Sequence, residues 1–176
     1  AAEWEGLQAS GAPTRIERCD TGEAAHIRRL LALMPSLAGV WHAAGVLADG
    51  VLPTQGAAAL GRVFAPKAHG AWSLHAAGMT SAITSVALFS SVASLSGGIG
   101  QANYAAANGY LDALVVSRRL RGALGSSLQI PAVQGAGMGA STFDDKQLEA
   151  IGAITLDEFA RWLVECLTPG LAVVER

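Results

Sequence analysis

Four polar side chains of this chain, taken together, could transfer a proton to a carbonyl oxygen. Tyr104 and Asn108 lie four residues apart in a helical pattern, so they share one face of a helix. Ser91 ends an apolar segment thirteen residues before Tyr104, and the glycine-rich turn between them can bring their hydroxyl groups together. Lys67 supplies an ammonium group from earlier in the chain. This set of groups suits the reduction of a carbonyl.

The chemistry requires the tyrosine to act as an acid. A phenol with its ordinary pKa of about 10 protonates a developing alkoxide usefully only if that pKa is lowered. A nearby ammonium group favours the phenolate, and Lys67 is the candidate for this role. Ser91 can donate a hydrogen bond to the same substrate oxygen. Taken alone, Tyr104 is more often a packing residue of an alanine-rich helix, but the four residues together favour catalysis.

Helical and strand patterns alternate along the chain, which predicts an α/β fold with a Rossmann-like, doubly wound parallel sheet. Alternating or continuously apolar segments predict five strands, at 14–19, 37–42, 82–90, 126–130 and 171–174. Helices are predicted at 3–10, 20–34, 55–64, 66–77, 103–121 and 155–167, the last opening with a capping box. Ligands of such sheets bind at the carboxyl ends of the strands, where residues 42–45 and 90–91 fall.

Composition limits the alternatives. A chain of 176 residues with 51% apolar and 15% charged residues is predicted to be one globular domain rather than a disordered segment. The net charge of −2 predicts no binding to nucleic acid or to an anionic membrane. The sequence shows no signal peptide and no apolar run near the length of about 18 residues that a membrane span needs, which predicts a cytoplasmic protein. Cys19 and Cys166 lack the spacing of metal ligands, so no metal site is predicted.

Four segments of the chain resemble the ketoreductase domains of modular polyketide synthases. They are GVWHAAGVL at 39–47, APK at 65–67, LFSSVA at 88–93 and GQANYAAAN at 100–108. The ketoreductase of animal fatty acid synthase is similar, and all belong to the short-chain dehydrogenase/reductase superfamily. The resemblance implies hydride transfer from NADPH to the β-carbon of a 3-oxoacyl chain on acyl carrier protein, within a multifunctional synthase.

One exchange of residues points to the synthase enzymes in particular. Ordinary short-chain dehydrogenases carry lysine four residues after the catalytic tyrosine, whereas this chain has Asn108 there and its lysine at Lys67. By resemblance, Tyr104 donates the proton, Ser91 orients the substrate carbonyl, Lys67 lowers the pKa of the tyrosine and Asn108 supports a proton relay. The same exchange disfavours a free-standing alcohol dehydrogenase.

The resemblance also implies a set of cofactor-binding residues. Asp20 matches the residue that contacts adenine, and the segment His42, Ala43, Ala44 and Gly45 matches the one that lines the cofactor. Ser90, Lys67 and Tyr104 are also expected to bind the cofactor, and Pro131 is expected to border the nicotinamide. For His42 a hydrogen-bonded core position is favoured over an acid/base role. His26, His69 and His75 match no pattern and are predicted to lie on the surface.

Residues near the substrate favour one stereochemical class. In the segment from Leu47 to Asp49, the aspartate matches the last position of the family's Leu-Asp-Asp motif, although its middle residue is alanine. Ser96 stands where the opposite class carries tryptophan. Both features favour a B-type reductase with a D-configured 3-hydroxyl product, although an ordinary loop carboxylate explains Asp49 equally well. Met138 is expected beside the substrate entrance.

The glycine-rich phosphate-binding turn and the first two strands of the family would precede residue 1. The GAGMGA segment at 135–140 imitates that turn, but the acidic residues about 20 positions later belong to a helix cap, so this match is rejected. We therefore expect residues 1–176 to form the C-terminal catalytic portion of one ketoreductase domain, completed by an N-terminal half and flanked by other synthase domains. By itself this portion is expected to be inactive. The rival interpretation is a non-catalytic structural segment of a synthase.

Overall fold

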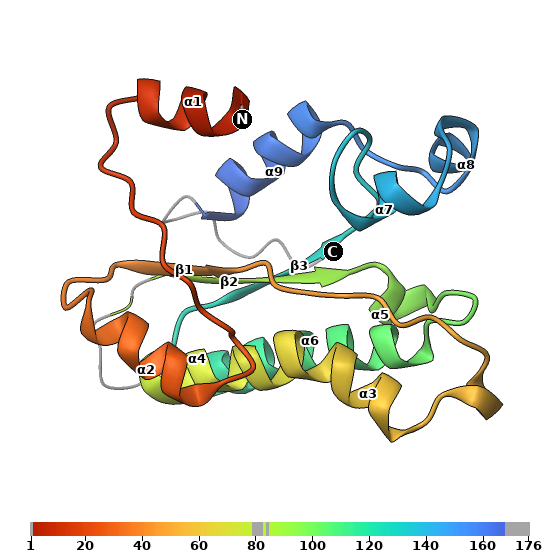
Figure 1. Ribbon diagram of the computed structural model, residues 1–176, viewed down its shortest axis with the longest axis horizontal. Coiled ribbons are helices and arrows are strands. Elements are labelled where there is room, and N and C mark those ends of the chain that lie inside the picture. The colour runs from red at the N-terminus through yellow and green to blue at the C-terminus, as the bar shows by residue number, and fades with distance from the viewer. Residues whose placement is uncertain (1, 79–82, 84, 168–176) are drawn as a thin grey trace.

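A computed structural model describes residues 2–78, 83 and 85–167 of the protein, and its sheet is parallel throughout (Figure 1). The strand order is β1 (Gly39–His42), β2 (Ser85–Ser91) and β3 (Ser126–Ile130). Trp41 pairs with Ala87, and Phe89 pairs with Leu128. All three strands therefore end at the same edge of the sheet, which is where a Rossmann-like fold binds its ligand.

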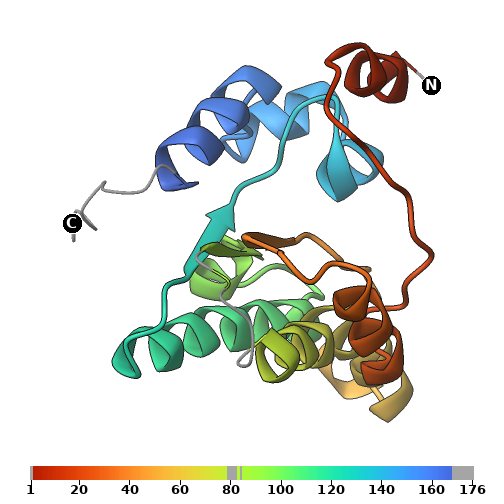
Figure 2. The same cartoon turned by 90° about the vertical axis from the view of Figure 1, so that its left-hand side faces the viewer.

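Helices cover both faces of the sheet (Figures 1 and 2). One layer holds α2 (Ala24–Ala32), α3 (Ala57–Phe64), α4 (Gly70–Gly78) and α6 (Ala102–Leu120). The other holds α1 (Ala2–Ala9), α7 (Gly137–Thr142), α8 (Asp145–Ala150) and α9 (Leu156–Leu167). Three short elements connect the others along the chain: η1 (Leu52–Thr54) precedes α3, the π-helix η2 (Ala65–His69) joins α3 to α4, and α5 (Ala93–Ser96) follows β2 (Ser85–Ser91). The predicted doubly wound arrangement is confirmed, with three strands in the described part of the chain.

The core lies between β2 and α6. Leu88 of β2 packs with Leu111, Leu114 and Val115 of α6, which recur at helical spacing and so share one buried face. A second cluster joins α3, α5 and the start of α6, with Val63, Ala93, Tyr104 and Ala107 as its buried members. The first turn of α6, which carries the candidate tyrosine, is thus held in place by packing on two neighbouring helices.

Most predicted elements are confirmed with small shifts at their ends. Strand 126–130 has the predicted bounds, and the predicted capping box is present before α9, where Thr155 and Glu158 exchange hydrogen bonds of 2.8 and 3.2 Å. The predicted helix at 66–77 begins instead with the π-helix η2. Helices α5, α7 and α8 were not predicted.

The strand predicted at 14–19 is wrong. These residues form no secondary structure, and Ile16 is 73% exposed. Alternation of polar and apolar residues makes a strand only where a neighbouring strand accepts its backbone hydrogen bonds, and no described residue pairs with this segment. The strand predicted at 171–174 lies outside the described residues.

In the described ranges no helix is both long and apolar enough to cross a lipid bilayer. The same ranges contain no group of three His, Cys, Asp or Glu side chains placed to hold a metal ion.

Candidate active site

Lys67 is presented to the site by the π-helix η2. A π-helical turn is wider than an α-helical turn and is often found at functional sites. The Lys67 side chain is only 3% exposed, and its Nζ donates a hydrogen bond to the Phe89 carbonyl oxygen of β2 at 2.9 Å. The same Nζ lies over the Tyr104 ring, 5.3 Å from the ring centroid. The fold therefore brings together the ammonium group and the phenol, which are far apart in the sequence.

Burial changes the acidity of Lys67. Loss of water around the ammonium group lowers the pKa of Lys67 to about 8, and the negative charge of Asp112 opposes this change. The side chain therefore remains largely charged at neutral pH but loses its proton only slightly above it.

Tyr104, Ser91 and Asn108 meet at the start of α6. Burial of the phenol raises the pKa of Tyr104, hydrogen bonds with the side chains of Asn108 and Ser91 lower it, and the charge of Asp49 raises it. The net effect is a raised pKa, because burial outweighs the hydrogen bonds. The Lys67 ammonium lies over the ring face, and its effect on the pKa of the phenol stays a prediction.

Asn108 is fully buried beneath Tyr104. Its Nδ2 donates to the Tyr104 carbonyl oxygen at 2.8 Å, one turn earlier in the helix. Its Oδ1 has no hydrogen-bond partner among the residues that the structure describes. A buried acceptor without a partner costs free energy, so this oxygen is suited to receive a water molecule or a ligand hydroxyl.

His42 supports Lys67 through its backbone. The imidazole is 3% exposed, and its Nε2 forms a hydrogen bond of 3.1 Å with the Lys67 carbonyl oxygen. Burial lowers the pKa of His42, so the ring stays neutral at pH 7. The interpretation of His42 as a hydrogen-bonded core residue is confirmed.

Ala43, Ala44 and Gly45 follow β1 at the ligand-binding edge of the sheet. A Cβ atom at Gly45 would lie 2.9 Å from Cε of Lys67. The absence of a side chain at this position therefore allows the lysine to reach Phe89 and the Tyr104 ring. Small residues here also leave room for a ligand against the sheet edge.

Gly45→Ala tests this close approach. We expect the added methyl group to displace the Lys67 side chain, lowering kcat/KM by about tenfold and stability by about 1 kcal/mol. Gly61→Ala is the matched control, because a Cβ at Gly61 would meet nothing within 4 Å and the residue lies inside α3. Ketone reduction assays and thermal unfolding of both variants check this. Equal activity of Gly45→Ala and wild type would contradict it.

The predicted substrate residues gather beside Tyr104. Leu47 and Met138 pack on the buried cluster that contains Tyr104. Asp49 accepts a hydrogen bond from Nε2 of Gln101 at 3.0 Å, and Nδ2 of Asn103 donates to the Ala48 carbonyl oxygen at 2.8 Å. The loop after β1 is thus bound to the first turn of α6.

A glycine completes this attachment. The Gly50 backbone N–H donates to the Gly100 carbonyl oxygen at 2.9 Å, and Gly100 has a φ of +72°. A side chain is disfavoured there both by the positive φ and by the Gly50 backbone, 3.4 Å from the position of a Cβ. Gln101, Asn103 and Gly100 were missed as functional candidates, although all lie within four residues before Tyr104.

Three further residues were predicted to bind the cofactor. Asp20 is exposed, and its side chain accepts a hydrogen bond from the Gly22 N–H at 2.9 Å. Ser90 is buried, and its Oγ donates to the Asn108 carbonyl oxygen at 3.3 Å. Pro131 directly follows β3 and is partly buried. Their contacts with a cofactor stay predictions.

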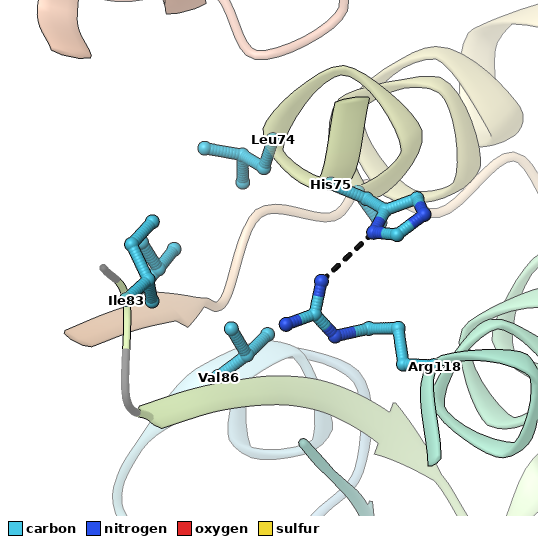
Figure 3. A pocket seen from close by; sticks show the side chains of 7 residues that line it. Leu74, His75, Ile83, Val86 and Arg118 are labelled. Atoms are coloured by element: carbon cyan, nitrogen blue, oxygen red, sulfur yellow. Dashed lines mark hydrogen bonds between the residues drawn. The ribbon is translucent and has the colours of Figure 1, made fainter. Parts of the chain in front are cut away.

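His75 is not a surface residue, in contrast to the prediction. Its ring is 8% exposed and its Nδ1 lies 2.8 Å from a guanidinium nitrogen of Arg118 (Figure 3). Burial and the Arg118 charge lower the pKa of His75, so the neutral ring accepts this hydrogen bond. The two side chains border a cavity of about 20 Å³ whose lining includes Leu74 and Val86. His26 and His69 are exposed, as expected.

The fold and the site define the class first. A parallel sheet between two helical layers, with candidate residues at the carboxyl edge of its strands, is a Rossmann-like architecture. The family model of the KR domain matches residues 1–135. The chain therefore belongs to the KR family, the ketoreductase domains of polyketide synthases.

Curated relatives and solved structures agree with this family. The polyketide synthase GfsA of Streptomyces halstedii is 46% identical over 130 residues, which are 72% of this chain and 2% of the relative. The spectinabilin synthase protein NorB of Streptomyces orinoci is 41% identical over 140 residues, 78% of this chain and 6% of the relative.

Among solved structures, the first ketoreductase of the tylosin PKS has a TM-score of 0.81 and 32% identity, covering 90% of this chain and 35% of that one. A structure of A-type ketoreductases from a modular polyketide synthase has a TM-score of 0.83 and 30% identity, covering 94% and 36%. The chain thus spans about a third of the length of these ketoreductase structures.

Proposed function

We propose that this chain carries the catalytic residues for NADPH-dependent reduction of a 3-oxoacyl chain, bound to acyl carrier protein, to the 3-hydroxyacyl product. The observation that supports this most strongly is the position of the Lys67 ammonium over the Tyr104 ring, with the side chains of Ser91 and Asn108 near enough to the phenol to lower its pKa. A scaffold does not need a desolvated lysine, because burying its ammonium group costs free energy.

Each residue of the site has a separate task in this proposal. NADPH, when bound, supplies a hydride to the carbonyl carbon. The Tyr104 phenol donates its proton to the oxygen on which negative charge develops, and the Ser91 hydroxyl stabilises the same oxygen with a hydrogen bond. The Lys67 charge stabilises the phenolate that remains. Asn108, through its unpartnered Oδ1, holds a water molecule for reprotonation.

The residues at the sheet edge fit the nicotinamide end of a dinucleotide. Ala43, Ala44 and Gly45 leave space after β1, and Lys67 and Tyr104 offer polar groups beside it. Asp20 is proposed to contact the adenine, and Ser90 and Pro131 to border the nicotinamide.

We further propose that the chain is the C-terminal catalytic portion of one ketoreductase domain, completed by an N-terminal half and operating beside other synthase domains. The length relation to the solved ketoreductases supports this, since the chain matches about a third of each. All experiments below therefore use the complete ketoreductase domain that contains this chain.

The product is proposed to be the D-configured 3-hydroxyl of a B-type reductase. Supporting this are Ser96 and the position of Asp49, which Gln101 holds near Tyr104 beside Leu47 and Met138. Chiral chromatography of the product formed from a 3-oxoacyl thioester tests the assignment. An L-configured product would contradict it.

An assay of 3-oxoacyl thioester reduction by NADPH tests the function itself. The reaction is monitored as the loss of absorbance of the reduced cofactor. The rival interpretation, a non-catalytic structural segment, predicts no NADPH binding by the complete domain. Calorimetric titration with NADPH distinguishes the two, and absence of binding would favour the structural segment. A free-standing alcohol dehydrogenase is disfavoured because the curated relatives named above are far longer synthases.

The pH dependence follows from Lys67. We expect kcat/KM to fall as pH rises through about 8, because the Lys67 ammonium loses its proton there. The Tyr104 phenol stays protonated over this range, since burial raises its pKa. A pH profile of wild type and Lys67→Arg checks this, because the guanidinium of the variant stays charged and its residual activity should show no fall near pH 8. A flat wild-type profile from pH 7 to 10 would contradict the expectation.

A further inference from the structure

Asp112 lies on the catalytic face of α6 and forms a polar cluster with β3. It follows Asn108 by four residues and Tyr104 by eight, so the three side chains share one side of the helix. Ser127 Oγ donates to Asp112 Oδ1 at 2.5 Å, and Gln129 Nε2 donates to Oδ2 at 3.0 Å. Both donors project from the same face of β3, because they lie two residues apart on one strand.

The cluster reaches the other elements of the site. Gln129 Nε2 also lies 3.3 Å from Ser94 Oγ of α5, and Ser94 Oγ donates to the Ser91 carbonyl oxygen at 2.8 Å. The cluster therefore links α6, β3 and α5 behind the side chains that face the substrate. Hydrogen bonds to an ionised acceptor are stronger than those between neutral groups, so a carboxylate holds these elements more firmly than an amide would.

The carboxylate also acts on Lys67 through space. Burial raises the pKa of Asp112, but hydrogen bonds from Ser127 and Gln129 lower it by more, so the group is ionised at neutral pH. The other titratable groups on η2 and on the helices packed against it are His69, Arg62, His75, Tyr104, Tyr110, Asp112, Arg118 and Arg119, and His42 is hydrogen bonded to the Lys67 carbonyl. Among them, Asp112 is the one whose negative charge favours the ammonium form of Lys67.

We propose that Asp112 is a positioning residue of the reductase, whose carboxylate holds the catalytic face of α6 against β3 and acts as a negative counter-charge to Lys67. The expected effect of Asp112 on turnover rests on the function proposed above. Its electrostatic part concerns Lys67 directly and can be measured without turnover.

Asp112→Asn tests the charge with little change of shape. We follow the Lys67 side chain by NMR of lysine labelled with 13C at Cε, and assign its signal as the one missing from Lys67→Arg. We expect the titration midpoint of Lys67 to fall by about half to one pH unit, because loss of a nearby negative charge destabilises the ammonium form. The falling limb of kcat/KM should move to lower pH by the same amount.

Asp145→Asn is the control, because Asp145 is exposed on α8 and its loss should leave the midpoint unchanged. Asp112→Glu keeps the negative charge, so its Lys67 titration midpoint should equal that of wild type. Ser127→Ala keeps the charge but removes one hydrogen bond, so kcat should fall about three- to tenfold with the midpoint unchanged.

An unchanged Lys67 midpoint in a folded Asp112→Asn domain would overturn the proposal, whatever the activity. If Asp112→Asn does not fold, the other two variants test the proposal. A wild-type kcat for Ser127→Ala would overturn the proposal, and so would a displaced Lys67 titration midpoint in Asp112→Glu. A wild-type domain that reduces no 3-oxoacyl thioester but shows the expected shift would reject the proposed function and keep the charge effect of Asp112.

Discussion

Replacing Tyr104 by phenylalanine is expected to lower kcat by at least about 1,000-fold, while the affinity for NADPH stays within about twofold of wild type. The substitution removes the hydroxyl that donates the proton and leaves the ring that packs against Val63, Ala93 and Ala107. The fold and the Lys67 contact with the ring face are therefore retained. Single-turnover reduction of a 3-oxoacyl thioester and calorimetric NADPH titration measure the two quantities.

The chain provides a matched control for this experiment. Tyr110 is the second of its two tyrosines, lies on the same helix and is partly buried beside the core cluster of β2 and α6. Tyr110→Phe should keep kcat within about twofold, because its phenol is not placed in the site. If Tyr104→Phe retained more than a tenth of wild-type turnover, the proton would have to come from another group, and the proposed function would fail.

Replacing Lys67 by methionine is expected to have opposite effects on activity and stability. Turnover should fall about 100- to 1,000-fold, because the positive charge that stabilises the Tyr104 phenolate is lost. Thermal stability at pH 7 should rise, because an apolar chain of similar length replaces an ammonium group that is only 3% exposed. Reduction assays and thermal unfolding of the same preparations measure both effects.

The sign of the stability change follows from the lysine pKa. In the folded chain it lies near 8, below its ordinary value of 10.5, so folding disfavours the charged form. The corresponding cost is about 3 kcal/mol at neutral pH, is present below pH 8 and disappears as pH rises toward 10.5. Loss of the hydrogen bond to Phe89 offsets part of the gain, so a net stabilisation of about 1 to 2 kcal/mol is expected at pH 7 and less at pH 10.

Lys146→Met is the control, because Lys146 is the second lysine of the chain and is exposed on α8. Its replacement should change neither turnover nor stability by a measurable amount. A Lys67→Met domain that is less stable than wild type at pH 7 would show that the hydrogen bond to Phe89 outweighs the cost of burying the charge.

Local sequence patterns predicted a helix or strand well where the element's own residues carry the signal. The helix containing Tyr104 and strand β3 were found from periodicity and turn residues alone, since both signals are local. The strand at 14–19 was wrong because pairing depends on a neighbour in space, which alternation does not contain. The helices α5, α7 and α8 were missed because segments of four to six residues carry too little periodic signal.

The candidate site divides in the same way. Tyr104 and Asn108 could be placed on one face from their spacing. Lys67 was named as the candidate ammonium group from the chemistry of the phenol, and the family resemblance then supported it, but no local pattern places it beside Tyr104. Three features of the site depend on interactions between segments that are far apart in the chain. They are the position of Lys67 over the phenol ring, the space that Gly45 leaves for the lysine side chain, and the effect of the Asp112 charge on Lys67.

By itself, the sequence determined the α/β class and the main helices and strands, and it named the candidate reacting groups, because these depend on residue type and short-range spacing. Only the tertiary structure decided their acidity. Burial raises the pKa of Tyr104 and lowers that of Lys67, and the strength of each effect depends on how much water the neighbouring helices exclude and which charges they bring near. Desolvation is a property of the packed chain, so no spacing of residues encodes it.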